Sequence, residues 1–229
     1  MKKTGSIWEL DSTERENEIS VVCKKLKDSY GSTRLGNPID PVDDLVYIIL
    51  SNKTSPSQAR KVYEDIKSRY PSWQDLLNST ENDLYKLVEP AGLANKKTRY
   101  IKGSIKQIKQ EYEDINLNEL SNQPNEEIHD FLTSLPGVSD KVAKCILIFT
   151  MDKKVLPVDS HVHRIASRLG WTSRKRADQS HEELEALVPP DKRYNFHVNS
   201  ILHGREICRP KMPKCDQCVI NQYCKYYTE

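Results

Sequence analysis

Long apolar runs are missing from this sequence of 229 residues. No stretch approaches the roughly 18 consecutive apolar residues that a membrane-spanning helix needs. The first residues also lack the apolar core of a signal peptide, because the chain turns acidic and polar soon after its initial lysine pair. We therefore expect an intracellular protein that does not contact a membrane. It would be found in the cytoplasm or nucleoid, or in the nucleus of a eukaryote.

The net charge is also small, because 35 lysines and arginines are balanced by 33 aspartates and glutamates, which leaves an excess of +2. So small an excess does not by itself indicate a nucleic-acid partner. Basic residues are nevertheless concentrated in residues 153–176, where Asp159 is the single acid among seven lysines and arginines. In isolation, such a run is as compatible with a solvated face as with a binding surface.

Strand patterns are also few. Apolar residues recur every three or four positions over most of the chain, as they do on one face of a helix. Pro56 and Thr80 suit the starts of helices. Residues 43–50 form a mostly apolar run that fits a helix or a strand. The sequence predicts an all-α protein without internal repeats or low-complexity segments.

Four of the six cysteines crowd the end of the chain, at Cys208, Cys215, Cys218 and Cys224. In a reducing compartment, disulfides between them are disfavoured, and a metal site is the better interpretation. Four thiolates can hold either one zinc ion or a [4Fe-4S] cluster. Zinc sites usually present two short cysteine pairs and this spacing has one, which favours the cluster and leaves zinc as the alternative.

The other two cysteines, Cys23 and Cys145, lie in helix-like patterns. Cys23 shares one helical face with Ile19, Val22 and Leu26. We expect both thiols to be buried in the core without a chemical role.

Residues 126–150 predict two helices joined by a tight turn. Pro136 and Gly137 end the first helix, and Ser139 or Asp140 can cap the second. Backbone N–H groups left unpaired at such a turn can bind a phosphate without reading sequence. An ordinary corner between two helices explains the pattern equally well.

Several blocks together resemble the helix-hairpin-helix DNA glycosylases of the endonuclease III family. They are LPGVSDKVAKCIL, PVDSHVHRIASRLGW and the four-cysteine loop, with GLANKKTRYI and ILHGREIC as further matches, and they span roughly residues 43–224. The resemblance implies that Lys141 is the nucleophile and Asp159 the second catalytic residue. It also implies that the four cysteines hold a [4Fe-4S] cluster.

The fold that the resemblance implies has two helical domains with a DNA-binding cleft between them. Residues 43–155 would form a helical barrel with the helix-hairpin-helix at about 126–150. Residues 156–229 would form the cluster domain, with its iron-sulfur loop at 208–224, and residues 1–42 would pack with that domain. The partner would be double-stranded DNA containing a damaged or mismatched base, bound by a monomer.

The expected chemistry suits these residue types. Breaking an N-glycosidic bond leaves positive charge on the deoxyribose, which a carboxylate such as Asp159 stabilises. A neutral lysine amine at C1′ can attack and form a Schiff base, and a helix N-terminus disfavours the charged form of Lys141. Outside this context, Lys141 would be read as a solvated surface lysine and Asp159 as a helix cap.

Further residues are expected to touch DNA. In the family, two barrel loops fill the gap left by a flipped nucleotide, and these positions fall on Lys53 and Leu93. Lys53 stands where glutamine is common, and Ser139 where glycine is usual, so a left-handed backbone there would strain the serine. The other expected DNA contacts are Gly137, Val138, His161, Arg174, Lys175 and Arg176.

The resemblance thus predicts a bifunctional DNA glycosylase and AP lyase of base excision repair. It would excise damaged, oxidised pyrimidines and nick the strand by β-elimination. One alternative is a mismatch or modified-base glycosylase, acting on U·G or T·G pairs or on 5-methylcytosine. A second alternative is a non-catalytic DNA-binding protein stabilised by zinc, which would have no need of Lys141 and Asp159.

Overall fold

The computed structural model describes residues 12–228, which fold into helices and connecting loops without a strand in that range. The α-helices are α1 (Ser12–Tyr30), α2 (Pro41–Ser51), α3 (Pro56–Arg69), α4 (Trp73–Asn78), α5 (Glu81–Val88), α6 (Ala94–Glu111), α7 (Asn125–Ser134), α8 (Asp140–Thr150), α9 (Ser160–Leu169), α10 (His181–Leu187), α11 (Arg193–Glu206) and α12 (Lys225–Thr228). The short 3-10 helices are η1 (Glu89–Ala91), η2 (Glu119–Asn122), η3 (Ala177–Gln179), η4 (Pro190–Lys192), η5 (Cys215–Gln217) and η6 (Asn221–Tyr223). None of the helices described is long and apolar enough to cross a membrane. The all-α prediction is confirmed for these residues.

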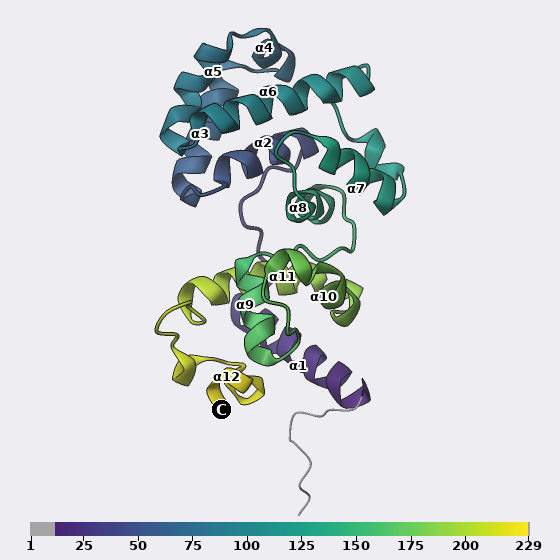
Figure 1. Ribbon diagram of the computed structural model, residues 1–229, viewed down its shortest axis with the longest axis vertical. Coiled ribbons are helices and arrows are strands. Elements are labelled where there is room, and N and C mark those ends of the chain that lie inside the picture. The colour runs from purple at the N-terminus through teal and green to yellow at the C-terminus, as the bar shows by residue number, and fades with distance from the viewer. Residues whose placement is uncertain (1–11, 229) are drawn as a thin grey trace, which may run out of the picture. The chain divides into compact units, whose positions relative to one another are not determined.

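The chain divides into two compact units, one of which is the continuous segment 36–153. Its central helix is α2, which lies against α3, α6 and α8 (Figure 1). The ambiguous run 43–50 is part of this helix, because Asp40 accepts hydrogen bonds from the first-turn N–H groups of Val42 and Asp43. Neighbours on several sides explain why α2 is apolar over most of its surface.

Of the second unit, the structure describes residues 12–35 and 154–228, and the expectation for residues 1–11 lies outside the described residues. Here α11 packs against both α1 and α9, and α12 packs against α9. The core joins residues far apart in the chain: Trp171 stacks on Phe196, and the Trp171 Nε1 donates a hydrogen bond of 2.8 Å to the Glu18 carboxylate. Cys23 is 6% exposed, and Cys145 of the first unit is 2% exposed, so both predicted core thiols are confirmed as buried.

The boundaries of these units differ slightly from those read from the sequence. Residues 36–42, which the sequence groups with the N-terminal segment, cluster with the continuous unit. The physical reason is local, because Asp40 caps α2 and the Asn37 amide donates to the Asp44 carboxylate at 2.6 Å. The later boundary falls at 153/154, two residues before position 155/156.

Candidate functional site: a helical hairpin, a capping aspartate and a cysteine loop

The hairpin between α7 and α8 is a tight turn. The Val138 N–H donates to the Leu135 carbonyl at 3.1 Å, and Gly137 has the left-handed φ of +81°. A Cβ at Gly137 would also lie 2.2 Å from the Tyr100 ring of α6. Both the backbone conformation and the close approach of Tyr100 therefore require glycine at this position.

Ser139 is the N-cap of α8, and its side chain makes no capping hydrogen bond. Its φ of −95° and ψ of 169° are ordinary extended backbone. The condition under which Ser139 would be strained is therefore not met, because the left-handed residue of this turn is Gly137. The first N–H groups of α8 therefore receive no side-chain cap from Ser139, and they suit an external anion such as a phosphate.

Lys141 is the second residue of α8 and is half-buried. Val138, the neighbour of Ser139 in the turn, is buried, whereas Gly137 is exposed. His129 Nε2 lies 2.7 Å from the Asp140 carboxylate and so joins α7 to the start of α8. The helix end that carries Lys141 is thus tied to the preceding helix.

Asp159, in the other unit, is the N-cap of α9. Its Oδ1 accepts hydrogen bonds from the N–H groups of His161 at 2.8 Å and Val162 at 2.9 Å. The helix-capping interpretation of Asp159 is confirmed. Within the described part of the chain, Oδ2 has no hydrogen-bond partner, and the side chain is partly exposed. The cap therefore fixes the carboxylate and leaves one oxygen available.

His161 follows Asp159 in the first turn of α9. Its Nδ1 lies 3.1 Å from Arg164 Nη2, and the ring packs so closely on Gly204 of α11 that a Cβ there would meet Nδ1 at 2.4 Å. Burial lowers the pKa of His161, with Asp159 opposing the shift and two arginines adding to it. The ring is half-buried, so its contacts with α11 occupy much of the side chain expected to touch DNA.

Five of the seven basic residues in the run 153–176 fall into two groups. Arg174, Lys175 and Arg176 are exposed, although Arg176 forms an ion pair with Asp178. Arg164 instead donates to the carbonyls of Gly204 and Cys208, and Arg168 donates to those of Arg209 and Pro210. The basic run is therefore not one uniform face, because these two arginines bind the backbone around the first cysteine.

The four cysteines Cys208, Cys215, Cys218 and Cys224 all line one small cavity. Arg168 Nη1 donates to Cys208 Sγ at 3.1 Å, and His203 Nε2 lies 3.4 Å from Cys218 Sγ. Burial raises the pKa of the Cys218 thiol to about 11, so a metal would have to supply the charge that ionises it. Among residues 12–228, no three histidine, cysteine, aspartate or glutamate side chains converge as ligands of a single ion. Donor chemistry and a shared cavity fit a cluster at this place.

Lys53 and Leu93 occupy two exposed turns of the continuous unit. Both have left-handed backbones, with φ of 54° and 53°, and Leu93 is 51% exposed despite its apolar side chain. Lys97 is buried beneath these turns, and its amine donates hydrogen bonds to the Thr54 hydroxyl in the first turn and to the Ala91 carbonyl just before the second. The sequence pattern could have drawn attention to Lys97, because it shares the buried stripe of α6 with Ala94, Ile101 and other core residues.

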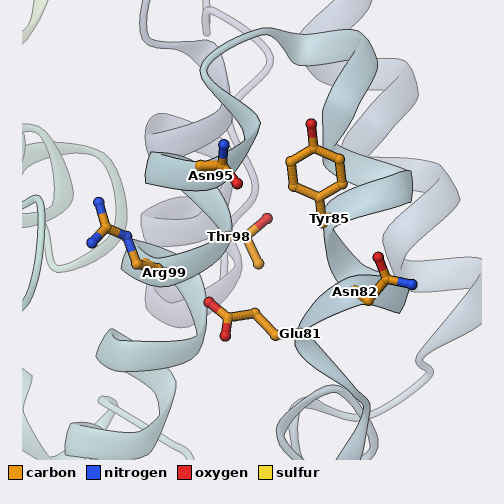
Figure 2. Close-up of a pocket in the computed structure, with 6 residues that line it drawn as sticks. All are labelled: Glu81, Asn82, Tyr85, Asn95, Thr98 and Arg99. Carbon is orange, nitrogen blue, oxygen red and sulfur yellow. The ribbon is translucent and has the colours of Figure 1, made fainter.

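A pocket of about 440 Å³ lies between α5 and α6 (Figure 2). Polar side chains surround it: Glu81, Asn82 and Tyr85 from α5, and Asn95, Thr98 and Arg99 from α6. The Thr98 hydroxyl is buried beneath it without a hydrogen-bond partner among the described residues. Sequence reasoning missed this pocket, since polar residues at helical spacing look the same on any solvated face.

Comparison with known proteins agrees with this set of features. The model of the HhH-GPD superfamily of base excision DNA repair proteins matches residues 46–190. An endonuclease III from Rickettsia felis is 30% identical over 185 residues, covering 80% of this chain and 82% of that protein.

Two solved structures share the fold. A non-covalent endonuclease III–DNA complex has a TM-score of 0.80 at 21% identity, covering 93% of this chain and 96% of that chain. A thermostable thymine-DNA glycosylase has a TM-score of 0.80 at 22% identity, covering 95% and 99% respectively. These likenesses establish the architecture, and the family match covers more than half of the sequence. The chain belongs to the endonuclease III family of helix-hairpin-helix base excision repair proteins, and it is a DNA glycosylase.

Proposed function

We propose that this glycosylase is bifunctional: it excises damaged, oxidised pyrimidines from double-stranded DNA and nicks the strand by β-elimination. The observation that carries the proposal is Lys141, half-buried in the first turn of α8 directly after the hairpin turn. Gly137, Val138 and Ser139 would hold a backbone phosphate at the open N-terminus of that helix. A phosphate held there would fix the position of the sugar to be attacked.

The chemistry assigns one role to each catalytic residue. The neutral Lys141 amine attacks C1′ of the flipped nucleotide, the bond from C1′ to the base breaks, and the base leaves with a proton. The C1′–O4′ bond of the sugar then breaks, O4′ takes up a proton, and the aminal becomes a ring-opened imine at C1′. This imine acidifies the proton on C2′, so that its removal forms a C2′–C3′ double bond, expels the 3′ phosphate and nicks the strand. Water then hydrolyses the imine and restores Lys141. The Asp159 carboxylate would stabilise the positive charge that develops on the sugar.

The test of the lysine is a borohydride trapping assay with duplex DNA that contains an oxidised pyrimidine. Lys141→Gln should abolish trapping and nicking, lowering the nicking rate by at least about a thousandfold, and should leave duplex binding largely intact. Lys144→Gln, one helical turn later, is the matched control and should still be trapped. A Lys141→Gln variant that releases the base at near the wild-type rate would show that water is the nucleophile.

We also propose that Cys208, Cys215, Cys218 and Cys224 hold a [4Fe-4S] cluster. Each thiolate would bind one iron, and the cluster would act as a cross-link of residues 208–224 rather than as a reagent. The purified protein should be yellow-brown, absorb near about 400 nm and contain about four irons. A colourless protein with one zinc would contradict this assignment. Cys218→Ser should impair folding, measured as soluble yield and thermal stability, more than it impairs catalysis of the folded fraction.

A second candidate is excision of a mismatched or modified base, as in U·G or T·G pairs. Lys53 favours it, because this position differs from the family's usual glutamine at a residue expected to face the opposite strand. The likeness to a thymine-DNA glycosylase supports the same possibility. Base release from a panel of duplexes, each with one oxidised base, mismatch or 5-methylcytosine, separates the two candidates by which duplex is cleaved fastest.

A further inference from the structure

The amine of Lys97 is buried in the continuous unit, and the side chain is 2% exposed. Its Nζ donates three hydrogen bonds of 2.7 Å, to the Leu50 carbonyl, the Thr54 hydroxyl and the Ala91 carbonyl. An ammonium group has three hydrogens, so these bonds use its full donor capacity. All three acceptors are neutral, and burial lowers the pKa of Lys97 to about 8. A cation buried without a carboxylate partner is costly, so its presence needs a reason beyond packing.

The three acceptors belong to three separate segments. Leu50 is in the last turn of α2, which has no basic residue of its own, so Lys97 supplies the cation that the carbonyl end of this helix favours. Thr54 lies in the turn after α2, and Ala91 ends η1. The Thr54 hydroxyl also donates to the Ala91 carbonyl at 2.5 Å, which closes the connection between the two turns.

These two turns carry Lys53 and Leu93. Lys53 is next to Thr54, and Leu93 is two residues after Ala91, so each turn contains or adjoins an acceptor of the Lys97 amine. The Lys97 backbone N–H also donates to the Leu93 carbonyl at 3.0 Å. Both residues have the left-handed backbone that side chains other than glycine rarely adopt. Such conformations persist where the surroundings enforce them. The Lys97 network provides that enforcement for both turns at once.

We propose that Lys97 is a positioning residue that holds the turns of Lys53 and Leu93 at a fixed separation, so that both side chains enter the DNA gap together. This inference rests on the proposed function, because the gap-filling roles of Lys53 and Leu93 belong to that function. Lys97 acts through backbone carbonyls and the Thr54 hydroxyl and touches no DNA itself. Two turns ordered before binding lose less conformational freedom when the flipped state forms.

The experiment compares affinity for a duplex with a tetrahydrofuran abasic site against the same duplex undamaged, by fluorescence anisotropy. Lys97→Met keeps an apolar stem and removes all three donors. We expect the preference for the abasic duplex to fall about tenfold, while affinity for undamaged duplex stays within about twofold. Lys96→Met removes an exposed lysine from the adjacent position and should leave the preference unchanged.

A double-variant cycle distinguishes positioning from general loosening of the fold. Leu93→Ala should reduce the abasic preference strongly in the wild-type background and much less in Lys97→Met, because the wedge is already misplaced there. Additive losses in a folded Lys97→Met protein would overturn the inference. An unchanged preference in that variant would overturn it as well.

Thr54→Val covers the case in which Lys97→Met does not fold. Valine has the shape of threonine and lacks the hydroxyl that joins Lys97 to the Ala91 carbonyl, so the abasic preference should fall about threefold. A wild-type preference retained in Thr54→Val would then overturn this inference alone. A wild-type protein without any abasic preference would overturn the proposed function together with it, so the two failures are distinguishable.

Discussion

The N-termini of α8 and α9 begin in different ways. At α8 the side chain of the N-cap Ser139 makes no capping hydrogen bond to the first N–H groups. At α9 the N-cap Asp159 accepts two of them through one carboxylate oxygen. A helix start without a cap has donors to offer an anion from outside, whereas a capped start has used them to hold its own side chain.

The difference assigns distinct tasks to two otherwise similar positions. The start of α8 is suited to recruit a phosphate, and Lys141 follows it within the same turn. The start of α9 is suited to orient a carboxylate whose second oxygen makes no hydrogen bond within the described residues. Under the proposed function, the same kind of backbone group would serve phosphate binding in one unit and orientation of the catalytic carboxylate in the other.

The largest expected effect separates capping from catalysis at α9. Asp159→Asn keeps a good N-cap and removes the charge that opposes the sugar cation. We expect base release under single-turnover conditions to fall at least about a hundredfold, with little change in thermal stability. Asp159→Ala should lose about 1 kcal/mol of stability in addition, because the cap is then missing. A near-normal rate for Asp159→Asn would mean that the residue is only a cap.

A smaller effect is expected from making α8 resemble α9. Ser139→Asp places a capping carboxylate at the hairpin, which should stabilise the fold by about 0.5 kcal/mol. The same charge should weaken affinity for undamaged duplex about tenfold, because it would stand at the proposed phosphate site. Ser139→Gly is the control and should bind normally, since the backbone at this position is ordinary. Unweakened binding by Ser139→Asp would place the phosphate elsewhere.

The smallest effect concerns pH and the start of α9. Because burial lowers the pKa of His161 in the folded state, the unfolded chain binds more protons as pH falls below about 6.5. The contribution of His161 to stability is therefore present above that pH and is lost as pH falls towards its folded pKa. Wild-type protein should lose more unfolding free energy than His161→Gln between pH 7 and pH 5 in urea titrations. Parallel losses in the two proteins would mean that His161 does not contribute.

The sequence predicts much of the scaffold because helices leave periodic signals. The start of α3 at Pro56 and the cap of α5 by Thr80 both follow from local chemistry, and the structure has them. Residues 43–50 stayed ambiguous because a helix surrounded by others loses its polar face. The left-handed position of the hairpin was also undetermined by the sequence, and the backbone of the folded turn assigns it to Gly137 and not to Ser139.

Long basic side chains were harder to assign. Arg164 and Arg168 lie in a basic run, yet they point to carbonyls about 40 residues later in the chain, which no local pattern encodes. Lys97 was hard to assign for another reason, because a lysine is expected on the surface and its three acceptors come from other segments of the chain. Both cases depend on tertiary contacts of single flexible side chains.

The discontinuous unit also sets an order of events during synthesis. Its first helix, α1, packs on α11, and the Tyr30 hydroxyl lies 2.9 Å from His203 Nδ1, 173 residues later in the chain. Residues 36–153 form a continuous unit whose contacts are complete well before α11 emerges from the ribosome. The apolar face of α1 therefore stays exposed to solvent or to chaperones until α11 has been synthesised. A truncation before α11 would leave this helix without its partner, and such fragments should aggregate even though the continuous unit is intact.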